Sequence, residues 1–170
     1  MHIAQQVHDL CLQKKITLGF AESCTGGALA CSIVANPGAS EYFLGSIVAY
    51  ANEVKVNVLD VDTHTLNQFG AVSLEVAEQM AIGACHKLGC NWAASVSGIL
   101  GPTGGTPDKP VGTVIAAIAH NGKLVHAWTM HLSGLRTELT QIVTEQVLKK
   151  LFDFIELNNS SQVQTRKMEQ

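Results

Sequence analysis

The chain has 170 residues, of which 46% are hydrophobic and 15% are charged, and its formal net charge is −3. This length and composition favour one globular domain with its own hydrophobic core and exclude a largely disordered chain. Only two arginines occur, and no clustered basic face of the kind that binds nucleic acid is visible. The sequence has no apolar run of about 18 residues and no secretory signal, so we expect a cytoplasmic protein without membrane or nucleic-acid partners.

The cysteines and histidines do not form a metal-binding or disulfide pattern. Five cysteines occur, an odd number without a CxxC pair, and a chain of this size does not need disulfides. The seven histidines are scattered and form no HExxH motif, so we expect no metal site. Cys24 is the one cysteine that we consider further as a functional residue, because it lies in a glycine-rich loop.

Helical and β-prone segments alternate along the first hundred residues. In chain order, the apolar pattern predicts a helix over 3–14, a strand over 16–21, a helix over 28–36, a central strand over 42–50, a helix capped by Asn52, a helix over 74–88 capped by Ser73, and a buried strand over 92–98. Helices that alternate with strands are typical of a parallel sheet covered on both faces.

A hairpin follows this alternating part. The β-prone runs 112–120 and 123–131 flank Asn121–Gly122, a dipeptide typical of a two-residue hairpin turn, and this turn requires one strand to run antiparallel. The predicted fold is therefore an α/β protein, a three-layer α/β/α sandwich with a mixed, mostly parallel five-stranded sheet.

The C-terminal part predicts one long helix and a tail. Ser133 is expected to cap an amphipathic helix that ends at about Leu157. We expect a single domain over 1–157 and a polar, flexible tail over 158–170.

Two glycine-rich loops follow predicted strands, at residues 22–27 and 98–112. In open α/β sheets, ligands bind beyond the carboxyl ends of the strands. The backbone N–H groups of paired glycines can converge on an anion, and the hydroxyls of Thr25 and Thr106 add donors. Glycine also simply makes turns, and neither loop is a Walker A or GxGxxG motif.

Ser23 is a candidate nucleophile at a strand-to-helix turn, where its hydroxyl projects from the edge of the sheet. The amides that follow it, at Thr25 to Gly27, are candidates for an oxyanion hole or a phosphate site. Without a base nearby, however, a serine at this position would merely cap the helix.

Lys55 is the candidate base. If Asn52 is the N-cap, Lys55 lies at the third position of the next helix, where the helix dipole and partial burial favour the neutral amine. A neutral lysine can take a proton from a serine, and Tyr50 could relay one. Taken alone, each has a simpler interpretation, Lys55 as a surface lysine and Tyr50 as a core residue.

Four segments together resemble the CinA C-terminal domain family. They are AESCTGG at 21–27, GSIVAYANEVK at 45–55, GAVSLEVAEQMAIGA at 70–84 and SVSGILGPTGGTPDKPVGTV at 95–114. The resemblance extends from about residue 3 to residue 150. Because the chain begins directly in this domain, it resembles the stand-alone form of the family.

The resemblance implies an α/β/α sandwich and a nicotinamide-nucleotide amidase that converts nicotinamide mononucleotide to nicotinate mononucleotide and ammonia. It implies a catalytic set of Ser23, Tyr50 and Lys55, no cofactor, and a homodimer or larger homo-oligomer. The substrate contacts that we expect are Thr25, Gly26, Gly27, Gly104, Gly105, Thr106 and Arg136.

The sequence departs from the family pattern at a few positions near these motifs. The family's GDRxxxR motif keeps Arg136, but Leu135 replaces its acidic residue and Thr140 its second arginine. GIAGP has become GILGP, and Leu100 is expected to narrow the pocket. Two alternatives to the amidase therefore stay open: a non-catalytic nucleotide-binding or regulatory member of the family, and an amidase with a changed substrate.

Overall fold

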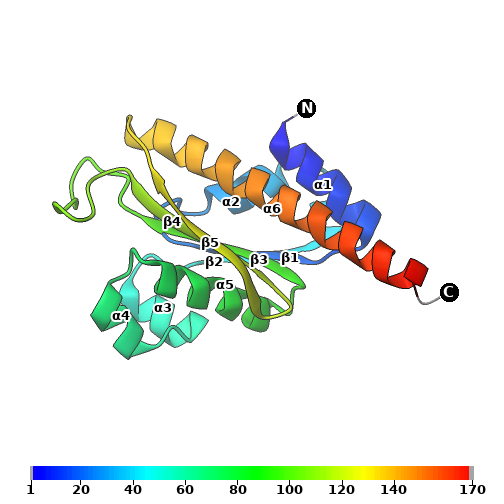
Figure 1. Cartoon of the computed structure of the whole chain (residues 1–170). Coiled ribbons are helices and arrows are strands. Elements are labelled where there is room, and N and C mark those ends of the chain that lie inside the picture. The colour runs from blue at the N-terminus through cyan, green and yellow to red at the C-terminus, as the bar shows by residue number, and fades with distance from the viewer. Residues whose placement is uncertain (1, 169–170) are drawn as a thin grey trace.

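The computed structural model describes residues 2–168, with side chains as far as Asn158. A five-stranded sheet lies between two layers of helices (Figure 1). The strands are β1 (Leu18–Glu22), β2 (Phe43–Val48), β3 (Trp92–Gly98), β4 (Thr113–His120) and β5 (Lys123–His131), and their order across the sheet is β2-β1-β3-β4-β5. The three-layer α/β/α fold predicted from the sequence is confirmed.

The directions of the strands follow from their connections. β1 pairs in parallel with both β2 and β3, whereas β4 runs antiparallel to β3 and to β5. The predicted Asn-Gly hairpin joins the last two strands, and both of its residues have positive φ angles, as this turn requires. Only β4 therefore runs against the other four strands.

The helices divide between the two faces of the sheet (Figure 1). One face carries α1 (Ile3–Lys14), α2 (Ala28–Val34) and α6 (Arg136–Met168), and the other carries α3 (Asn52–Leu59), α4 (Thr63–Phe69) and α5 (Leu74–Leu88). A single 3₁₀ turn, Ala39–Glu41, precedes β2. Because the sheet is covered on both faces, β1 and β3 are almost wholly buried along their length.

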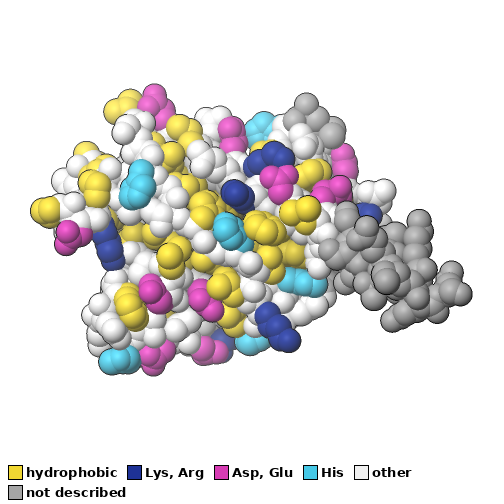
Figure 2. Space-filling model, viewed as in Figure 1, with side chains coloured by type: hydrophobic (Ala, Val, Ile, Leu, Met, Phe, Trp, Pro, Cys, Tyr) yellow, Lys and Arg dark blue, Asp and Glu magenta, His cyan; other side chains and the backbone are white. Residues whose placement is uncertain are grey.

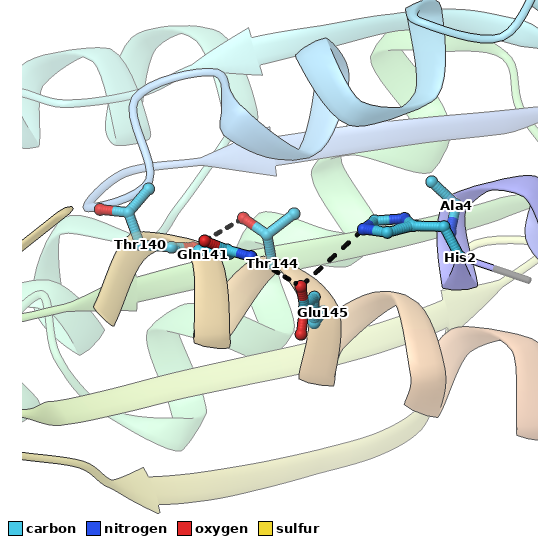
Figure 3. Close-up of polar contacts among 6 residues, drawn as sticks. All are labelled: His2, Ala4, Thr140, Gln141, Thr144 and Glu145. Carbon is cyan, nitrogen blue, oxygen red and sulfur yellow. Dashed lines mark hydrogen bonds and ion pairs between the residues drawn. The ribbon is translucent and has the colours of Figure 1, made fainter. Parts of the chain in front are cut away.

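The two helices at the N- and C-terminal ends lie side by side (Figure 1). Figure 3 shows a polar contact between them, in which His2, the N-cap residue of α1, faces Glu145 of α6 with 3.8 Å between Nε2 and Oε1. Gln141 donates to the same carboxylate at 3.0 Å. Within residues 2–168, none of the helices combines the length and the apolar character that a membrane span requires.

Two elements differ from those that the sequence pattern predicts. The strand expected at the centre of the sheet is β2, which forms one edge and leaves Leu44 and Val48 about half exposed. β2 pairs only with β1, and an apolar composition alone does not distinguish an edge strand from a central strand. The short helix α4 was not predicted, although Asp62 caps it by accepting from the Thr65 amide at 2.8 Å.

Two predicted helix caps are wrong. The N-cap of α3 is Ala51, one residue before Asn52, so that Lys55 occupies the fourth helical position. Helix α6 does not begin after Ser133, because the Glu138 carboxylate accepts from the Leu135 amide at 3.0 Å and fixes the start at the next residue.

Helix α6 is also longer than expected. It continues to Met168 instead of ending at about Leu157. Asn158, the first residue of the predicted tail, contacts His120 of β4 through its side-chain amide, with 3.3 Å between Nδ2 and Nδ1. The flexibility predicted for 158–170 stays a prediction.

The order of the strands creates a switch point beside β1. From β1 the chain crosses to β2 on one side, and it returns to β3 on the other side of β1. Connections leave in opposite directions at such a point, and a crevice opens beyond the carboxyl ends of the two strands. Ser23 follows β1 and residue 99 follows β3, so both glycine-rich loops begin at this crevice.

Candidate active site

Ser23 lies in the turn between β1 and α2. Its amide donates to Val96 O of β3 at 2.9 Å, so the position of its backbone is fixed by the sheet. Gly26 and Gly27 follow with φ angles of 61° and 105°, in the left-handed region that favours glycine. The turn therefore reverses within a few residues and leaves Ser23 at the carboxyl edge of the sheet.

Lys55 reaches Ser23 from the first turn of α3. Its Nζ donates to Ser23 Oγ at 3.2 Å, and it also donates to the backbone oxygens of Ala49 at 2.8 Å and Tyr50 at 3.2 Å. The lysine is only 1% exposed, and Ser23 is buried as well. The structure thus brings together the two residues that the sequence suggested as nucleophile and base.

The surroundings of Lys55 favour the neutral amine. Burial lowers the pKa of Lys55 from its ordinary value, against the weaker opposing effects of Cys24 and Glu53. Its three hydrogen-bond partners are uncharged. A neutral amine can donate to the two carbonyl oxygens and turn its lone pair to the Ser23 hydroxyl, which is the arrangement that a general base requires.

The hydroxyl of Tyr50 does not join this pair. It accepts from Arg136 Nη2 at 3.1 Å, and Arg136 Nη1 donates to Gly101 O at 2.8 Å. Tyr50 is 61% exposed, and its contact with Lys55 is through its backbone oxygen. The contacts in this structure give the hydroxyl of Tyr50 a part in holding Arg136, whereas a proton relay to Ser23 stays a prediction.

A cavity of about 270 Å³ opens above Ser23 and Lys55. Its lining comes from the loop after β1, the start of α3, the segment before α5, the loop after β3 and the first residue of α6. Arg136 supplies the positive charge of its lining, since burial favours the neutral form of Lys55, and no acidic side chain is among the described residues that line it. The electrostatics of this cavity favour an anionic ligand.

Only some of the predicted substrate contacts face this cavity. Gly104 and Arg136 line it, whereas the remaining predicted contacts do not: Thr25, Gly26, Gly27, Gly105 and Thr106. Several of their donors already have partners inside the protein. The Thr25 hydroxyl and the Gly27 amide both donate to the carboxylate of Glu22, at 2.8 and 3.0 Å, and the Thr106 amide donates to Lys109 O at 2.9 Å.

The amides of Gly26 and Gly27 have oxygen acceptors within the protein, whereas those of Cys24 and Thr25 have none among the described residues. Gly26 N donates to Ser23 O at 3.1 Å. In the part of the chain that the structure describes, the amides of Cys24 and Thr25 donate to no oxygen acceptor. Because they directly follow the candidate nucleophile, they are the better candidates for an oxyanion hole.

The structure adds lining residues that the sequence patterns did not indicate. Asn52 and Ser97 are the polar members of this group, and Ala71 and Val72 are its apolar members. The Ser97 hydroxyl donates to Ala71 O at 2.7 Å and ties the segment before α5 to β3. The position of Ser97 near the carboxyl end of a buried strand could have indicated a site residue. The residue types of 70–73, in contrast, do not indicate that Ala71 and Val72 line a cavity.

Cys24 also lines the cavity, but burial raises the pKa of its thiol to about 12. A thiol with this pKa is protonated at neutral pH and is a poor nucleophile. Ser23 is therefore the better candidate of the two neighbours.

Three departures from the family pattern have different structural consequences. Leu100 is 2% exposed and takes part both in the core and in the cavity wall, whereas the narrowing of the pocket expected from it stays a prediction. Leu135 is exposed. Thr140 points its hydroxyl back along α6 to Arg136 O at 2.8 Å, and Thr144 repeats this contact with Thr140 O one turn later (Figure 3).

A larger groove of about 840 Å³ lies away from these residues, between β5, α6 and the start of α1. Figure 2 shows hydrophobic side chains exposed along this face, over β5 and beside α6, and Trp128, Met130, Leu132 and Ile142 line the groove. Among the described residues that line this groove, no hydroxyl or thiol contacts a basic side chain. The smaller cavity is therefore the better candidate for an active site.

Comparisons with known proteins agree on one family. The family model of the CinA C-terminal domain matches residues 1–155. A CinA-like protein of Leptospira borgpetersenii is 48% identical over 151 residues, which cover 89% of this chain and 36% of that protein. A CinA-like protein of Trichodesmium erythraeum is 46% identical over 134 residues, covering 79% of this chain and 32% of that protein. The chain thus spans about a third of the length of these relatives.

Solved structures show the same fold. A CinA superfamily protein from Klebsiella pneumoniae matches with a TM-score of 0.87 at 28% identity and covers 91% of this chain and 96% of its own. A competence/damage inducible protein from Agrobacterium tumefaciens matches with a TM-score of 0.84 at 34% identity, covering 89% and 94%. The chain belongs to the CinA C-terminal domain family.

Proposed function

We propose that this chain is an amidase that hydrolyses the carboxamide of nicotinamide mononucleotide to nicotinate mononucleotide and ammonia. The observation that carries the proposal is the buried amine of Lys55, 3.2 Å from Ser23 Oγ at the base of a cavity. Family membership supports the proposal. The absence of acidic lining residues, among those described, suits a substrate that carries a phosphate.

The chemistry begins with proton transfer from Ser23 to neutral Lys55. The serine oxygen attacks the carboxamide carbon, and the amides of Cys24 and Thr25 stabilise the oxyanion. Lys55 then gives its proton to the departing nitrogen, and ammonia leaves an ester on Ser23. Water attacks that ester with Lys55 again as the base, and nicotinate mononucleotide is released from the restored serine.

Arg136 is the proposed partner of the substrate's phosphate. Its guanidinium lines the cavity, and two neutral oxygens hold it, so its positive charge is not matched by an acidic partner in the described part of the chain. Arginine binds phosphate through two parallel N–H donors. The loop around Gly104 closes the same side of the cavity.

The proposal is tested by incubating the purified protein with nicotinamide mononucleotide and measuring both products. We expect equal amounts of ammonia and nicotinate mononucleotide. Nicotinamide riboside, which lacks the phosphate, should react with a kcat/KM at least about tenfold lower, because Arg136 then has no anion to bind.

Two other outcomes separate the alternatives. Binding of the nucleotide without ammonia release contradicts the amidase and indicates a nucleotide-binding member of the family; the position of the Tyr50 hydroxyl, away from Ser23, favours this alternative. Ammonia release from other amides only indicates a changed substrate, for which Leu100 in the cavity wall is the structural reason.

A further inference from the structure

We propose that Glu22 is a positioning residue, whose carboxylate holds the turn of Ser23 at the distance from Lys55 that activation requires. This inference rests on the proposed function. Glu22 is the last residue of β1, directly before Ser23, and it is fully buried. Glutamates are rarely buried completely unless they have partners, and the reason for this one lies in its contacts.

Five donors surround the carboxylate of Glu22. Oε2 accepts from the Thr25 hydroxyl at 2.8 Å and from the amides of Gly27 and Leu29 at 3.0 Å each. Oε1 accepts from the Ala30 amide at 3.0 Å and the Ser46 hydroxyl at 2.9 Å. None of the ion pairs among the described residues includes Glu22, so these donors alone balance the burial of its carboxylate.

These contacts join the support of the nucleophile to the support of the base. Thr25 and Gly27 belong to the turn that carries Ser23, whereas Ser46 belongs to β2, which leads to α3 and Lys55. The backbone continues the same connection: Glu22 O accepts from the Ala49 amide at 2.7 Å, and Ala49 O accepts from Lys55 Nζ at 2.8 Å. One residue thus fixes both sides of the contact between Ser23 and Lys55.

The carboxylate also consumes donors that an anionic ligand would otherwise use. The first loop has the composition of a phosphate cradle, but three of its surrounding amides point to Glu22. The protein's own anion occupies this position, and its function here is structural support of the nucleophile. The amides of Cys24 and Thr25 are not among the donors to Glu22.

The direct test is the reactivity of Ser23 in Glu22→Gln. The substitution keeps the volume of the side chain but replaces one carboxylate oxygen by an NH₂ group. This group cannot accept from the N–H or O–H donors that the oxygen faced. The probe is a fluorophosphonate, which reports the reactivity of the serine without any natural substrate; the labelled peptide is measured by mass spectrometry. We expect labelling of Ser23 to slow by about 10- to 100-fold, because small displacements of reacting groups have effects of this size.

Steady-state kinetics give a second readout. On nicotinamide mononucleotide, kcat should fall by a similar factor while KM stays within about twofold, since the cavity residues that bind the phosphate are unchanged. Asp62→Asn is the matched control: it makes the same chemical change at the cap of α4, which lies outside the cavity lining. Its labelling rate should equal that of the wild type even where its thermal stability falls.

Ser46→Ala supplies a milder variant if Glu22→Gln does not fold. It keeps the carboxylate and removes only its link to β2, and we expect slower labelling of a folded protein. Labelling at the wild-type rate in folded Glu22→Gln, or in folded Ser46→Ala where the first variant does not fold, overturns the proposal, as does a wild-type Ser23 that the probe does not modify.

The two proposals fail in different ways. If the wild type releases no ammonia from the nucleotide but Ser23 is labelled quickly, and slowly in Glu22→Gln, the positioning role stands and the proposed function fails. If the wild type is an amidase and folded Glu22→Gln keeps its kcat and its labelling rate, the function stands and the positioning role fails.

Discussion

At the scale of the residue, the amine of Lys55 is held by two backbone oxygens and one hydroxyl, with almost no exposure to water. An ammonium group at such a place loses its hydration and gains no anionic partner among its hydrogen-bond acceptors, and burial therefore lowers its pKa. The same geometry that makes the charged form costly places the neutral amine against the Ser23 hydroxyl, as the proposed general base requires.

The lowered pKa predicts how activity depends on pH. Because the base is the neutral amine, kcat/KM should rise with pH through the pKa of Lys55, which lies below the ordinary value of 10.5. Lys55→Met should remove this rise and lower kcat by about 10²- to 10⁴-fold. Lys109→Met, which removes a lysine of the neighbouring loop, should keep it. A rate that is flat between about pH 6 and about pH 10 contradicts this assignment.

The same shift has a defined sign for stability. Between the folded and the unfolded pKa values of Lys55, the unfolded chain binds a proton that the folded chain does not. The contribution of Lys55 to the free energy of unfolding therefore rises with pH across this interval, and it is constant below the folded pKa, where both states carry the proton.

Sequence reasoning found the candidate pair of nucleophile and base but not its support. Ser23 and Lys55 are recognisable from a strand-to-helix turn and a helix start, and the structure places them in contact. Thr25 and Gly27 were interpreted as ligand donors, because a sequence does not show which donors an internal acceptor has already taken. Glu22 takes both, and only the fold reveals it.

At the scale of the element, Arg136 links three parts of the chain that the sequence keeps far apart. It is the first residue of α6, and it donates to the end of the β2–α3 connection at Tyr50 and to the loop after β3 at Gly101. A cation at the start of a helix is in the unfavourable half of the helix dipole, so stability of the helix is not the reason for its position. Binding of an anionic ligand is a sufficient reason for the position of Arg136.

This link predicts the effect of Tyr50→Phe. The variant keeps the ring and the backbone oxygen that holds Lys55, and it removes only the hydroxyl that accepts from Arg136. We expect KM for the nucleotide to rise by about three- to tenfold with kcat within about threefold, because Arg136 loses one of its two anchors.

The control for this experiment is Tyr42→Phe. It deletes the hydroxyl of the other tyrosine, which contacts His8 within the core, and it should leave KM unchanged. A fall of kcat by more than about 100-fold in Tyr50→Phe with KM unchanged contradicts the anchoring role and returns Tyr50 to a proton relay.

The elements themselves were predicted unevenly, for physical reasons. The Asn121–Gly122 turn and the buried run of β3 have strong local signals, and both are present as expected. Helix α4 has only seven residues and little apolar periodicity, so its cap at Asp62 was its one clear sign. The start of α6 depends on the contact between the Glu138 carboxylate and the Leu135 amide. This contact takes the place of the cap expected from Ser133.

At the scale of the whole molecule, the switch point of the sheet accounts for the position of the site. The loops after β1 and β3 meet there, and α3 and α6 bring Lys55 and Arg136 to the same crevice from opposite faces. The fold class follows from the alternation of helices and strands. The order of strands does not, because it depends on which long connection crosses which face, and this order decides that the two glycine-rich loops are neighbours.

The measurement that tests the central claim most directly is ammonia release from nicotinamide mononucleotide by the wild type and by Ser23→Ala under identical conditions. Ser32→Ala serves as the control, since it removes a hydroxyl that contacts only its own helix, at Leu29 O. We predict release by the wild type and the control and a loss of at least about 10³-fold in Ser23→Ala. Release by folded Ser23→Ala at the rate of the wild type would contradict the account.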